Sequence, residues 1–579
     1  MLRLFSLQVI NPGYKLSASR NSRQRQVEYS ARGLIYDRNG QIIVYNKPAY
    51  DLMITPLEVG VFDTTELCTS IDITKEEMIA GIKKARSYSP FLPFAIVRQI
   101  SAERYAGLQE KMYKFPGFEV QTRMIRAYNQ PIASHVIGYL GEVDREGLNL
   151  DSYYNQGDYL GQDGLEKQYE KELRGTKGIR YVLVDVHNKE QGSYEGGRYD
   201  TLAQPGKTIV SSLDSELQAY GEKLMKNKIG SIVAIEPSTG EILAMVSSPG
   251  FDPGTLVGRQ RSSNYKLLSI DSLKPMFNRA TKSRYAPGSI FKIVQALIAL
   301  DMGLITPTTG FECNKNLIGC HIHPEATDVK KAIRYSCNPY FFQVYKKIIL
   351  HPVTSSIFKS SEIGLADWKE YVEEFGLGIN WPIDYPAVSS GVVPGPELYN
   401  DWYGKGRWAF STIYSNCNGQ GEIETVPIQI ANLAAIIANR GYYYVPHFIR
   451  EMEGIDTIPS LFREKHVTRV DSEYFDLVVQ ALYDVVWEAN GTGWRARVPG
   501  VEVCGKTGTV ENNSGEDHSG FLAFAPMENP QIALAVYVEN AGGGGTWAAP
   551  IASLLIEKYL KHEVTQKEKE ERILNLVMY

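Results

Sequence analysis

Residues 287–300 read PGSIFKIVQALIAL, and this stretch decides how the middle of the chain folds. The opening Pro-Gly is typical of a helix entry. Nearly every later position is apolar, which predicts a helix buried on most of its sides. Ser289 is expected in the first turn, where free backbone N–H groups and the helix dipole favour developing negative charge. Lys292 follows three residues later, on the same face as the serine.

Two further strings give this helix start a chemical meaning. Ser336-Cys337-Asn338 precedes a proline, which predicts a turn, and Lys506-Thr507-Gly508-Thr509 continues a β-rich run. Lys-Thr-Gly occurs once in the chain. Only Ser289 combines a helix entry, a long apolar helix and an S-x-N string before that Lys-Thr-Gly. Other matches to S-x-x-K or S-x-N lack this context and lie at 19–21, 262–264, 263–266 and 356–359.

The residue types in these strings suit acyl transfer by a serine. Such an enzyme needs an oxygen nucleophile, a base, and N–H or cationic groups aimed at the oxyanion. We expect Ser289 to be the nucleophile. Lys292 is the expected general base, because burial and the second cation, Lys506, should lower its pKa. Ser336 is expected to relay a proton between lysine and leaving group, and the amide of Asn338 to bind the substrate backbone.

The Lys-Thr-Gly strand is expected to bind the substrate. Gly508 lets another backbone come close, so a peptide could add alongside this strand. Lys506 and the hydroxyl of Thr507 or Thr509 are expected to meet a terminal carboxylate. The N–H groups of Thr509 and Ser289 are expected to form an oxyanion hole.

The three strings together are a signature of penicillin-binding proteins and class A β-lactamases, and the chain resembles a class B penicillin-binding protein from about residue 4 to residue 560. Residues 229–244 resemble the opening strands of the family's transpeptidase domain, and residues 419–441 its late helical region. Residues 32–40 and 161–175 resemble its non-catalytic pedestal, in a form most like the elongation-type members, penicillin-binding protein 2. No segment resembles the glycosyltransferase domain of class A members.

The resemblance implies a peptidoglycan D,D-transpeptidase that acts in cell elongation. Ser289 would attack the penultimate D-Ala carbonyl of a stem pentapeptide, and an amine of a neighbouring stem would resolve the acyl-enzyme. β-Lactams would acylate the same serine. The implied partners are stem peptides, nascent glycan, a membrane glycan polymerase of the RodA type and elongation-complex proteins; no cofactor is implied. Two alternatives stay open: a D,D-carboxypeptidase or β-lactamase-like hydrolase, and a non-enzymatic receptor or scaffold that β-lactams acylate.

The order of elements predicts an α+β protein with two domains. Residues 1–208 are expected to form an elongated pedestal, or dimerisation domain, that ends near a Pro-Gly turn. Residues 209–562 are expected to form a penicillin-binding transpeptidase domain, whose central antiparallel sheet pairs its first and last elements and carries helices on both sides. Residues 563–579 form a charged tail helix that either docks or stays disordered. Within the pedestal we expect strands at 33–45, 50–55 and 178–185, and helices at 75–87 and 102–113.

The N-terminus bears on membrane attachment. No run of eighteen apolar residues occurs, so the sequence as given predicts no transmembrane helix. Residues 1–12 resemble the juxtamembrane stretch that follows the family's anchor. We therefore expect a truncated single-pass anchor in the inner membrane, with a periplasmic catalytic domain. Residues 1–27 contain five Lys or Arg and no acid, which the positive-inside bias would place in the cytoplasm, and an exposed basic arm is the alternative.

A small group of Cys and His residues lies in a connection between two predicted helices. Cys313 and Cys320 could form a disulfide in an oxidising compartment. They could instead join His323, with Asp328 as a further donor, in binding zinc. Their spacing is not a standard ligand pattern, so free structural thiols are the default interpretation and no metal is assigned. Cys337 is given no role.

The overall composition agrees with a multidomain globular protein. A length of 579 residues predicts several domains, and 43% hydrophobic with 22% charged residues is ordinary. A net charge of −5 gives no reason to expect nucleic acid as a partner. Gly542–Gly545 lack the following Lys and Ser or Thr of a phosphate-binding loop, so a tight turn is predicted there.

Overall fold

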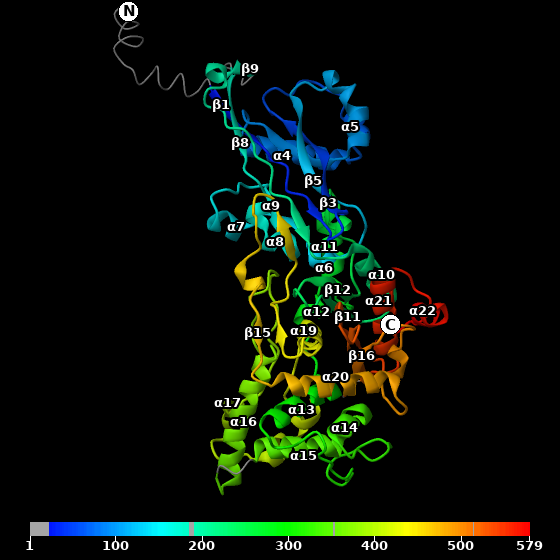
Figure 1. The fold of residues 1–579 in the computed structure, drawn as a ribbon. Helices are drawn as coiled ribbons and strands as arrows, with labels where there is room; N and C mark the ends of the chain where they lie inside the picture. Colours follow the sequence, from blue (N-terminus) through cyan, green and yellow to red (C-terminus); the bar gives the residue numbers. More distant parts are fainter. Residues whose placement is uncertain (1–22, 185–189, 351–353, 513–514) are drawn as a thin grey trace, which may run out of the picture.

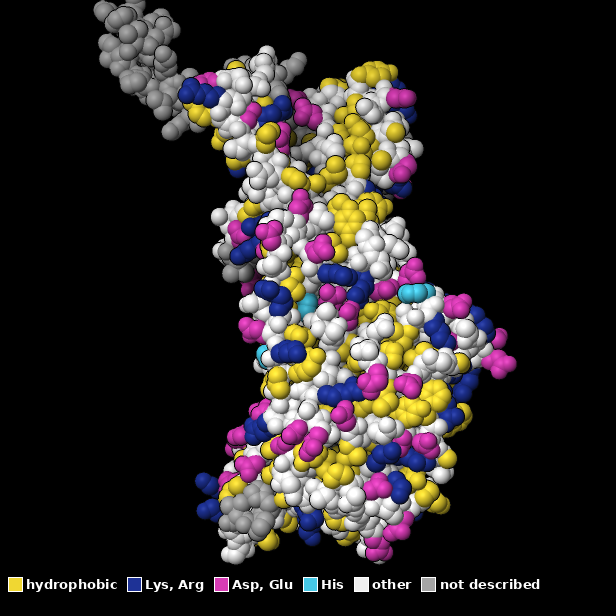
Figure 2. Space-filling view, viewed as in Figure 1, with side chains coloured by type: hydrophobic (Ala, Val, Ile, Leu, Met, Phe, Trp, Pro, Cys, Tyr) yellow, Lys and Arg dark blue, Asp and Glu magenta, His cyan; other side chains and the backbone are white. Residues whose placement is uncertain are grey.

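The computed structural model describes residues 23–184, 190–350, 354–512 and 515–579. A slender N-terminal half stands on a broader C-terminal half, so the molecule is elongated (Figure 1). Acidic and basic side chains lie interspersed along the face shown in Figure 2. The expected juxtamembrane stretch, residues 1–12, lies outside the described residues. Among the described helices, none is both long and apolar enough to span a membrane.

A five-stranded sheet with the order β12-β11-β18-β17-β16 forms the centre of the C-terminal half. Every neighbouring pair is antiparallel, and Gly230 at the start of β11 pairs with Val538 at the end of β18. The predicted central antiparallel sheet, with its first and last elements paired, is confirmed. Its strands are β11 (Gly230–Ile235), β12 (Ile242–Ser248), β16 (Cys504–Val510), β17 (His518–Ala525) and β18 (Ile532–Val538).

Helices cover both faces of this sheet because its strands are apolar on both sides. Ile232 of β11 belongs to an apolar cluster with α10 (Ser215–Met225) and α21 (Ala548–Lys561). The next residue, Val233, belongs to a second cluster with α19 (Pro427–Ala438). Successive residues of a strand face opposite sides, so the C-terminal half has the predicted helices on both sides of the sheet.

A helical region packs beside the β16 edge of the sheet. At its centre, α13 (Lys292–Asp301) is buried from its first residue to Leu300, as the apolar run predicts. α20 (Ser472–Trp487) lies between this helix and β16 (Figure 1). The surrounding helices are α14 (Val329–Tyr335), α15 (Asn338–Ile349) and α16 (Ile357–Glu374).

The α-helix starts later than the sequence predicts. Gly288–Phe291 form one 3-10 turn, η5, and α-helical geometry begins at Lys292. Ser289 therefore lies in a tight turn ahead of α13. Gly288 has a φ of +55°, and a Cβ there would lie 2.5 Å from the carbonyl oxygen of Thr509. Because only glycine tolerates both the left-handed backbone and this approach, the sequence places the serine turn directly against β16.

The pedestal is built around two long strands. β3 (Ile42–Ile54) and β5 (Phe118–Tyr128) pair antiparallel along most of their length, and β4 (Phe94–Ile100) pairs with the far end of β3. Helices close over this end and share a separate apolar cluster with it. They are α3 (Thr64–Ile71), α4 (Lys75–Tyr88) and α5 (Ala102–Gln109), and the last two confirm the helices predicted at 75–87 and 102–113, apart from their ends.

The two halves share a sheet at their junction. β10 (Ile209–Ser211) pairs in parallel with β2 (Ile35–Tyr36) of the pedestal and antiparallel with β14 (Ile449–Met452) of the C-terminal half. The chain therefore continues from the pedestal to the C-terminal half inside a sheet and not through an exposed linker.

The C-terminal tail folds as α22 (Lys567–Leu574) and docks. Ile573 is fully buried in the cluster that contains α10 and α21, and the N–H of Met578 donates to the carbonyl of Asn227 at 2.9 Å. Of the two outcomes expected for this segment, docking is the one observed. The remaining helices and strands are β1 (Arg23–Glu28), α6 (Ser134–Ile137), β6 (Leu140–Glu142), α7 (Arg145–Leu150), β7 (Tyr159–Gly161), α8 (Gly164–Gln168), α9 (Glu170–Leu173), β8 (Gly178–Val184), β9 (Glu190–Ser193), α11 (Arg261–Ile270), α12 (Arg279–Lys282), α17 (Pro396–Tyr403), α18 (Phe410–Ile413), β13 (Tyr442–Tyr443) and β15 (His466–Val467).

Candidate active site

Ser289 lines a cleft together with residues from all three strings. The walls of this cleft include Ser336 and Asn338 from the α14–α15 turn, and Thr507 and Thr509 from β16. The N–H of Gly288 donates to the carbonyl of Gly419 at 2.8 Å, which fixes the serine turn from below. Within the described part of the chain, the hydroxyl of Ser289 makes no hydrogen bond. The serine is half-buried and available to a ligand in the cleft.

Lys292 lies beneath the cleft and is fully buried. Its Nζ donates to the carbonyl of Ser336 at 2.8 Å, to the hydroxyl of Ser336 at 3.2 Å and to Oδ1 of Asn338 at 2.5 Å. Because burial removes water from the ammonium group, it lowers the pKa of Lys292 to about 8. A lysine in this state is neutral often enough near neutral pH to accept a proton.

Lys506, which lies on β16, also contacts Ser336. Its Nζ donates to the hydroxyl of Ser336 at 3.1 Å and to the carbonyl of Thr507 at 3.2 Å. Burial, and after it the positive charge of Lys292, hold the pKa of Lys506 well below its usual range. One hydroxyl oxygen thus connects two buried amines, and the two lysines titrate as a pair.

The turn between α14 and α15 presents Ser336 and Asn338 as the sequence predicts. Ser336 ends α14 with a φ of +56°, and Asn338 begins α15 one residue before a proline. Both ends of the Asn338 amide are engaged, since Nδ2 donates to the carbonyl of Gly319 at 2.7 Å while Oδ1 accepts from Lys292. The amide therefore holds the side chain of Lys292 in place.

β16 forms one wall of the cleft and ends the sheet. The hydroxyls of Thr507 and Thr492 lie 2.9 Å apart, and the hydroxyl of Thr509 accepts from the N–H of Gly544 at 3.3 Å. A Cβ on Gly508 would lie 3.0 Å from the side chain of Ile290, so the glycine allows the serine turn to pack against the strand.

The structure adds cleft residues that the sequence reasoning missed. Gln420, Thr492 and Arg495 line the cleft, and so do Gly543–Thr546. The glycine run lies between β18 and α21, where a tight turn was predicted, but its packing against β16 was not foreseen. A Cβ on Gly544 would lie 2.3 Å from the carbonyl oxygen of Gly508. A run of glycines close behind a strand is the signal that could have indicated such an approach.

A group of four possible metal ligands lies beside the Ser336–Asn338 turn. The donor atoms of Cys313, Cys320, His323 and Cys337 all lie within 4.8 Å of one another. Nε2 of His323 is 3.5 Å from Sγ of Cys313 and 3.3 Å from Sγ of Cys320. Nδ1 of His323 lies 2.6 Å from the carbonyl oxygen of Pro324, which assigns its proton to Nδ1 and leaves Nε2 free to bind a metal.

Cys337 belongs to this group, although its place in the sequence predicts no role for it. The three cysteines of the group are free, so the disulfide alternative for Cys313 and Cys320 is not what the structure contains. A hydrogen bond from Cys337 holds the pKa of the Cys320 thiol well below its usual range. The N–H of Asn338 also approaches Sγ of Cys320 at 3.4 Å, so the cluster contacts the catalytic turn directly.

Comparison with known proteins places this geometry in a family. The penicillin-binding protein transpeptidase domain matches residues 230–557, and the penicillin-binding protein dimerisation domain matches residues 27–211. The peptidoglycan D,D-transpeptidase MrdA of Acinetobacter baumannii is 30% identical, over 97% of this chain and 84% of that protein.

Solved structures agree with this assignment. Pseudomonas aeruginosa PBP2 in complex with WCK 5153 matches with a TM-score of 0.66 at 26% identity, over 94% of this chain and 99% of that one. The complex of PBP2 and MreC from Helicobacter pylori matches with a TM-score of 0.73 at 23% identity, over 93% and 100% of the two chains, which shows a shared fold. The transpeptidase domain matches more than half of this chain, and the relatives align along nearly all of it. The chain therefore belongs to the penicillin-binding proteins, in the elongation-type group represented by PBP2.

Proposed function

We propose that this protein is a peptidoglycan D,D-transpeptidase that cross-links stem peptides through an acyl-enzyme on Ser289 during cell elongation. The observation that carries the proposal is the hydroxyl of Ser336, which joins the buried amines of Lys292 and Lys506 beside the cleft that holds Ser289. Relatives named peptidoglycan D,D-transpeptidase, aligned along nearly the whole chain, support the substrate class.

Acylation starts when neutral Lys292 takes the proton of the Ser289 hydroxyl. The contact forms when substrate binds, since catalytic hydrogen bonds often tighten only then. Oγ attacks the carbonyl carbon of the penultimate D-Ala, and the N–H groups of Ser289 and Thr509 receive the oxyanion. As the tetrahedral intermediate collapses, the peptide C–N bond breaks. The leaving amine of D-Ala takes the proton from Lys292 through the hydroxyl of Ser336, and the lysine is neutral again.

Transfer reverses these steps with a new amine. The amine of a neighbouring stem attacks the ester carbonyl and loses a proton to Lys292, and the C–O bond to Ser289 breaks as Oγ regains a proton. A β-lactam would acylate the same oxygen, but its leaving amine stays attached after ring opening. Because that amine cannot diffuse away, the acyl-enzyme would persist.

The β16 wall supplies the proposed carboxylate site. Lys506 contributes positive charge when it carries the single proton of the lysine pair, and the hydroxyls of Thr507 and Thr509 face the cleft that would receive the terminal D-Ala. The outer edge of β16 is the end of the sheet, so an extended donor peptide can add there with backbone hydrogen bonds.

A turnover experiment separates this proposal from its alternatives. A D-Ala-D-Ala peptide is incubated with the protein, with and without an acceptor amine. A transfer product supports the transpeptidase, hydrolysis alone supports a carboxypeptidase or β-lactamase-like hydrolase, and one stable acylation supports a receptor or scaffold. Fluorescent penicillin should label the wild type and not Ser289→Ala; equal labelling of that variant would rule out Ser289 as the nucleophile.

We also propose that the protein works with a RodA-type glycan polymerase and other elongation proteins, on nascent glycan. One structural neighbour is a complex of PBP2 with MreC, which supports partners of this kind. The proposed location is the inner membrane, with a single span and a periplasmic catalytic domain, because the polymer substrate lies outside the cytoplasm. The proposed domains are 1–208, 209–562 and a 563–579 tail, supported by the family matches at 27–211 and 230–557.

A structural zinc site is proposed at Cys313, Cys320, His323 and Cys337. Three thiolates and one imidazole are a suitable ligand set for tetrahedral Zn²⁺. The ion would displace the thiol protons, and its positive charge would stabilise the three sulfur atoms that lie buried close together. Elemental analysis of the purified protein should give one zinc per chain, and Co²⁺ exchange should give thiolate charge-transfer absorption. Cys313→Ser should lower both, whereas Cys68→Ser, in the pedestal, should not. Equal zinc content in wild type and Cys313→Ser would contradict the site.

A further inference from the structure

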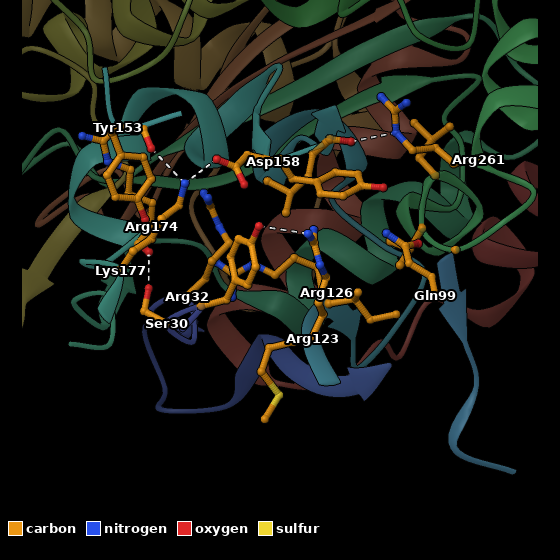
Figure 3. Close-up of a pocket in the computed structure, with 18 residues that line it drawn as sticks. Ser30, Arg32, Gln99, Arg123, Arg126, Tyr153, Asp158, Arg174, Lys177 and Arg261 are labelled. Carbon is orange, nitrogen blue, oxygen red and sulfur yellow. Dashed lines mark hydrogen bonds and ion pairs between the residues drawn. The ribbon is translucent and has the colours of Figure 1, made fainter. Parts of the chain in front are cut away.

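A cavity lies at the junction of the two halves of the molecule and shares no lining residue with the cleft around Ser289. It has a volume of about 100 Å³ and is partly open to solvent. After β12 the chain forms η4 (Pro253–Leu256) and α11, which reach from the catalytic half to the pedestal (Figure 1). Val257 and Arg261 of this excursion line the cavity together with residues of β5 and of the segment after α9. Figure 3 shows Arg261 on the side opposite Arg174 and Lys177.

Most of the cations around this cavity are already neutralised. Only Asp158 among the lining residues is acidic, but further carboxylates lie behind the wall. These carboxylates form ion pairs with four of the cations, so the charges of those cations are neutralised within the protein and need no ligand. The pairs are Arg32 with Glu166 and Glu170, Arg123 with Asp51, Arg174 with Asp151 and Lys177 with Asp158.

Arg126 keeps one donor free inside the cavity wall. The residue is 2% exposed, and its Nε donates to Glu166 at 2.6 Å while Nη1 donates to the carbonyl of Gly33 at 2.8 Å. Nη2 is buried and has no partner within the described residues. Burial and the charge of Arg32, which shares Glu166, lower the pKa of Arg126. A buried cationic donor without an acceptor is costly, and an anionic acceptor from outside would satisfy it.

Two other groups complete a polar set around the same space. Arg261 donates from Nε to the carbonyl of Leu140 at 2.9 Å, and its two terminal nitrogens have no hydrogen bond in the part of the chain that the structure describes. Asp158 is 4% exposed, and its Oδ1 is buried without a donor among those residues. The cavity thus offers two guanidinium groups and one carboxylate acceptor.

Between these polar groups the walls are aromatic and aliphatic. Tyrosine rings and apolar chains leave the interior mainly apolar, which is usual for sites that enclose a small organic molecule. The residues are Tyr29, Met124, Ile125, Tyr153, Tyr159, Leu256 and Val257.

We propose that this cavity binds a small organic oxyanion, a carboxylate or phosphate ester on a flat apolar body that also carries a hydroxyl or amine. The oxyanion contacts Arg126 of the pedestal and Arg261 of the catalytic half, the hydroxyl or amine donates to Asp158, and the body stacks on the tyrosines. The ligand therefore contacts both halves and stabilises their junction. The proposal does not depend on the catalytic chemistry of Ser289.

Calorimetric titration at constant ionic strength tests the proposal with defined probes. The protein is first treated with penicillin, so that the catalytic cleft is occupied. The probes are 4-hydroxybenzoate and phenyl phosphate, with the neutral analogue 4-hydroxybenzyl alcohol and inorganic phosphate as references. We expect the two aromatic anions to bind about tenfold more tightly than either reference, since one hydrogen bond to a charged group is worth about that factor.

Matched variants locate the site. Arg261→Gln should weaken both aromatic anions about tenfold, and Val257→Trp, which fills the cavity, should abolish their binding. Arg259→Gln serves as the control, because Arg259 donates to the carbonyls of Ile71 and Asp72 outside this cavity and joins the same two halves. The control should bind like the wild type.

Three results would overturn the proposal. They are equal binding of the anions and their references, equal binding by wild type and Arg261→Gln, and absence of binding by every probe. Penicillin labelling of each variant is measured separately. Loss of labelling in the wild type would contradict the proposed function alone, because the effects of Arg261→Gln and Val257→Trp on probe binding remain measurable.

Discussion

Ser336 contacts both Lys292 and Lys506, two lysines whose pKa values are lowered by burial. Its hydroxyl can donate to a neutral amine and accept from a charged one at the same moment, so the pair is most stable with a single positive charge. The arrangement supplies a base and a cation from two residues of the same type.

The first prediction concerns pH. Protonated Lys292 cannot accept the Ser289 proton, and its pKa is about 8. The rate constant for acylation by a fluorescent penicillin should therefore rise as pH increases through about 8, where the neutral form accumulates. Lys292→Arg stays charged at every accessible pH and should lose at least about a hundredfold in rate with no such rise. A rate independent of pH in the wild type would contradict Lys292 as the base.

A second prediction tests the serine turn. Gly288→Ala puts a Cβ 2.5 Å from the carbonyl oxygen of Thr509 and also strains a φ of +55°. Displacing Ser289 by about 1 Å should lower acylation about a hundredfold. Gly303→Ala is the matched control, because Gly303 has a φ of +66° with open space around it. The control should lose about 1 kcal/mol of stability and keep its acylation rate; equal rates for both variants would show that the close packing is dispensable.

At the scale of elements, the docked tail reaches the catalytic cleft. Nζ of Lys569 in α22 donates to the carbonyls of Arg495 and Arg497 and to the hydroxyl of Ser553, at 3.0, 3.1 and 2.9 Å. Arg495 lines the cleft. On the same helix, the guanidinium of Arg572 lies 4.6 Å from the ring centre of Trp547, next to the glycine run. α22 thus holds two cleft walls from behind.

This contact gives a third prediction. Lys569→Met removes three hydrogen bonds from one ammonium group and should lower the acylation rate about three- to tenfold by loosening the wall at Arg495. Lys567→Met, on the exposed side of the same helix, is the control and should acylate like the wild type. Faster amide exchange around 494–497 in Lys569→Met alone would confirm the cause, whereas unchanged rate and exchange would show that the helix only covers the core.

The sequence predicted those elements whose signals are local. The run behind Ser289 predicted a buried helix, the proline after Asn338 a turn, and the β-rich run before Lys506 a strand. Cys337 was missed because it lies 14 residues after His323 in the chain, a spacing that matches no standard ligand pattern and is closed only by the fold of the connection. The junction cavity could not be predicted from the sequence either, because its walls come from segments that are far apart in the chain.

The pedestal contains a buried group of charged side chains around Glu166, separate from the active site. Glu166 is fully buried and accepts from Arg126 at 2.6 Å and from Arg32 at 2.6 Å. Arg126 comes from β5, Arg32 from the segment before β2 and Glu166 from α8, so one carboxylate connects three separate parts of the pedestal.

The fourth prediction follows from that burial. Glu166→Gln leaves the buried guanidinium of Arg126 without its counter-charge, and Arg32 keeps only Glu170, so the change should destabilise the pedestal by about 3–5 kcal/mol. Glu142→Gln removes a pair with Arg98 that is about half exposed and should cost no more than about 1 kcal/mol. Urea unfolding followed by limited proteolysis measures both. Penicillin labelling of the still-folded catalytic half should persist in Glu166→Gln, and its early loss would mean that the halves unfold as one unit.

The strand β10 has a mechanical consequence. It lies between β2 of the pedestal and β14 of the catalytic half, with backbone hydrogen bonds to each. A displacement of the pedestal is therefore transmitted to the C-terminal half through backbone hydrogen bonds and not through a flexible linker. A partner protein that moves the pedestal during glycan synthesis will therefore also change the orientation of the catalytic cleft.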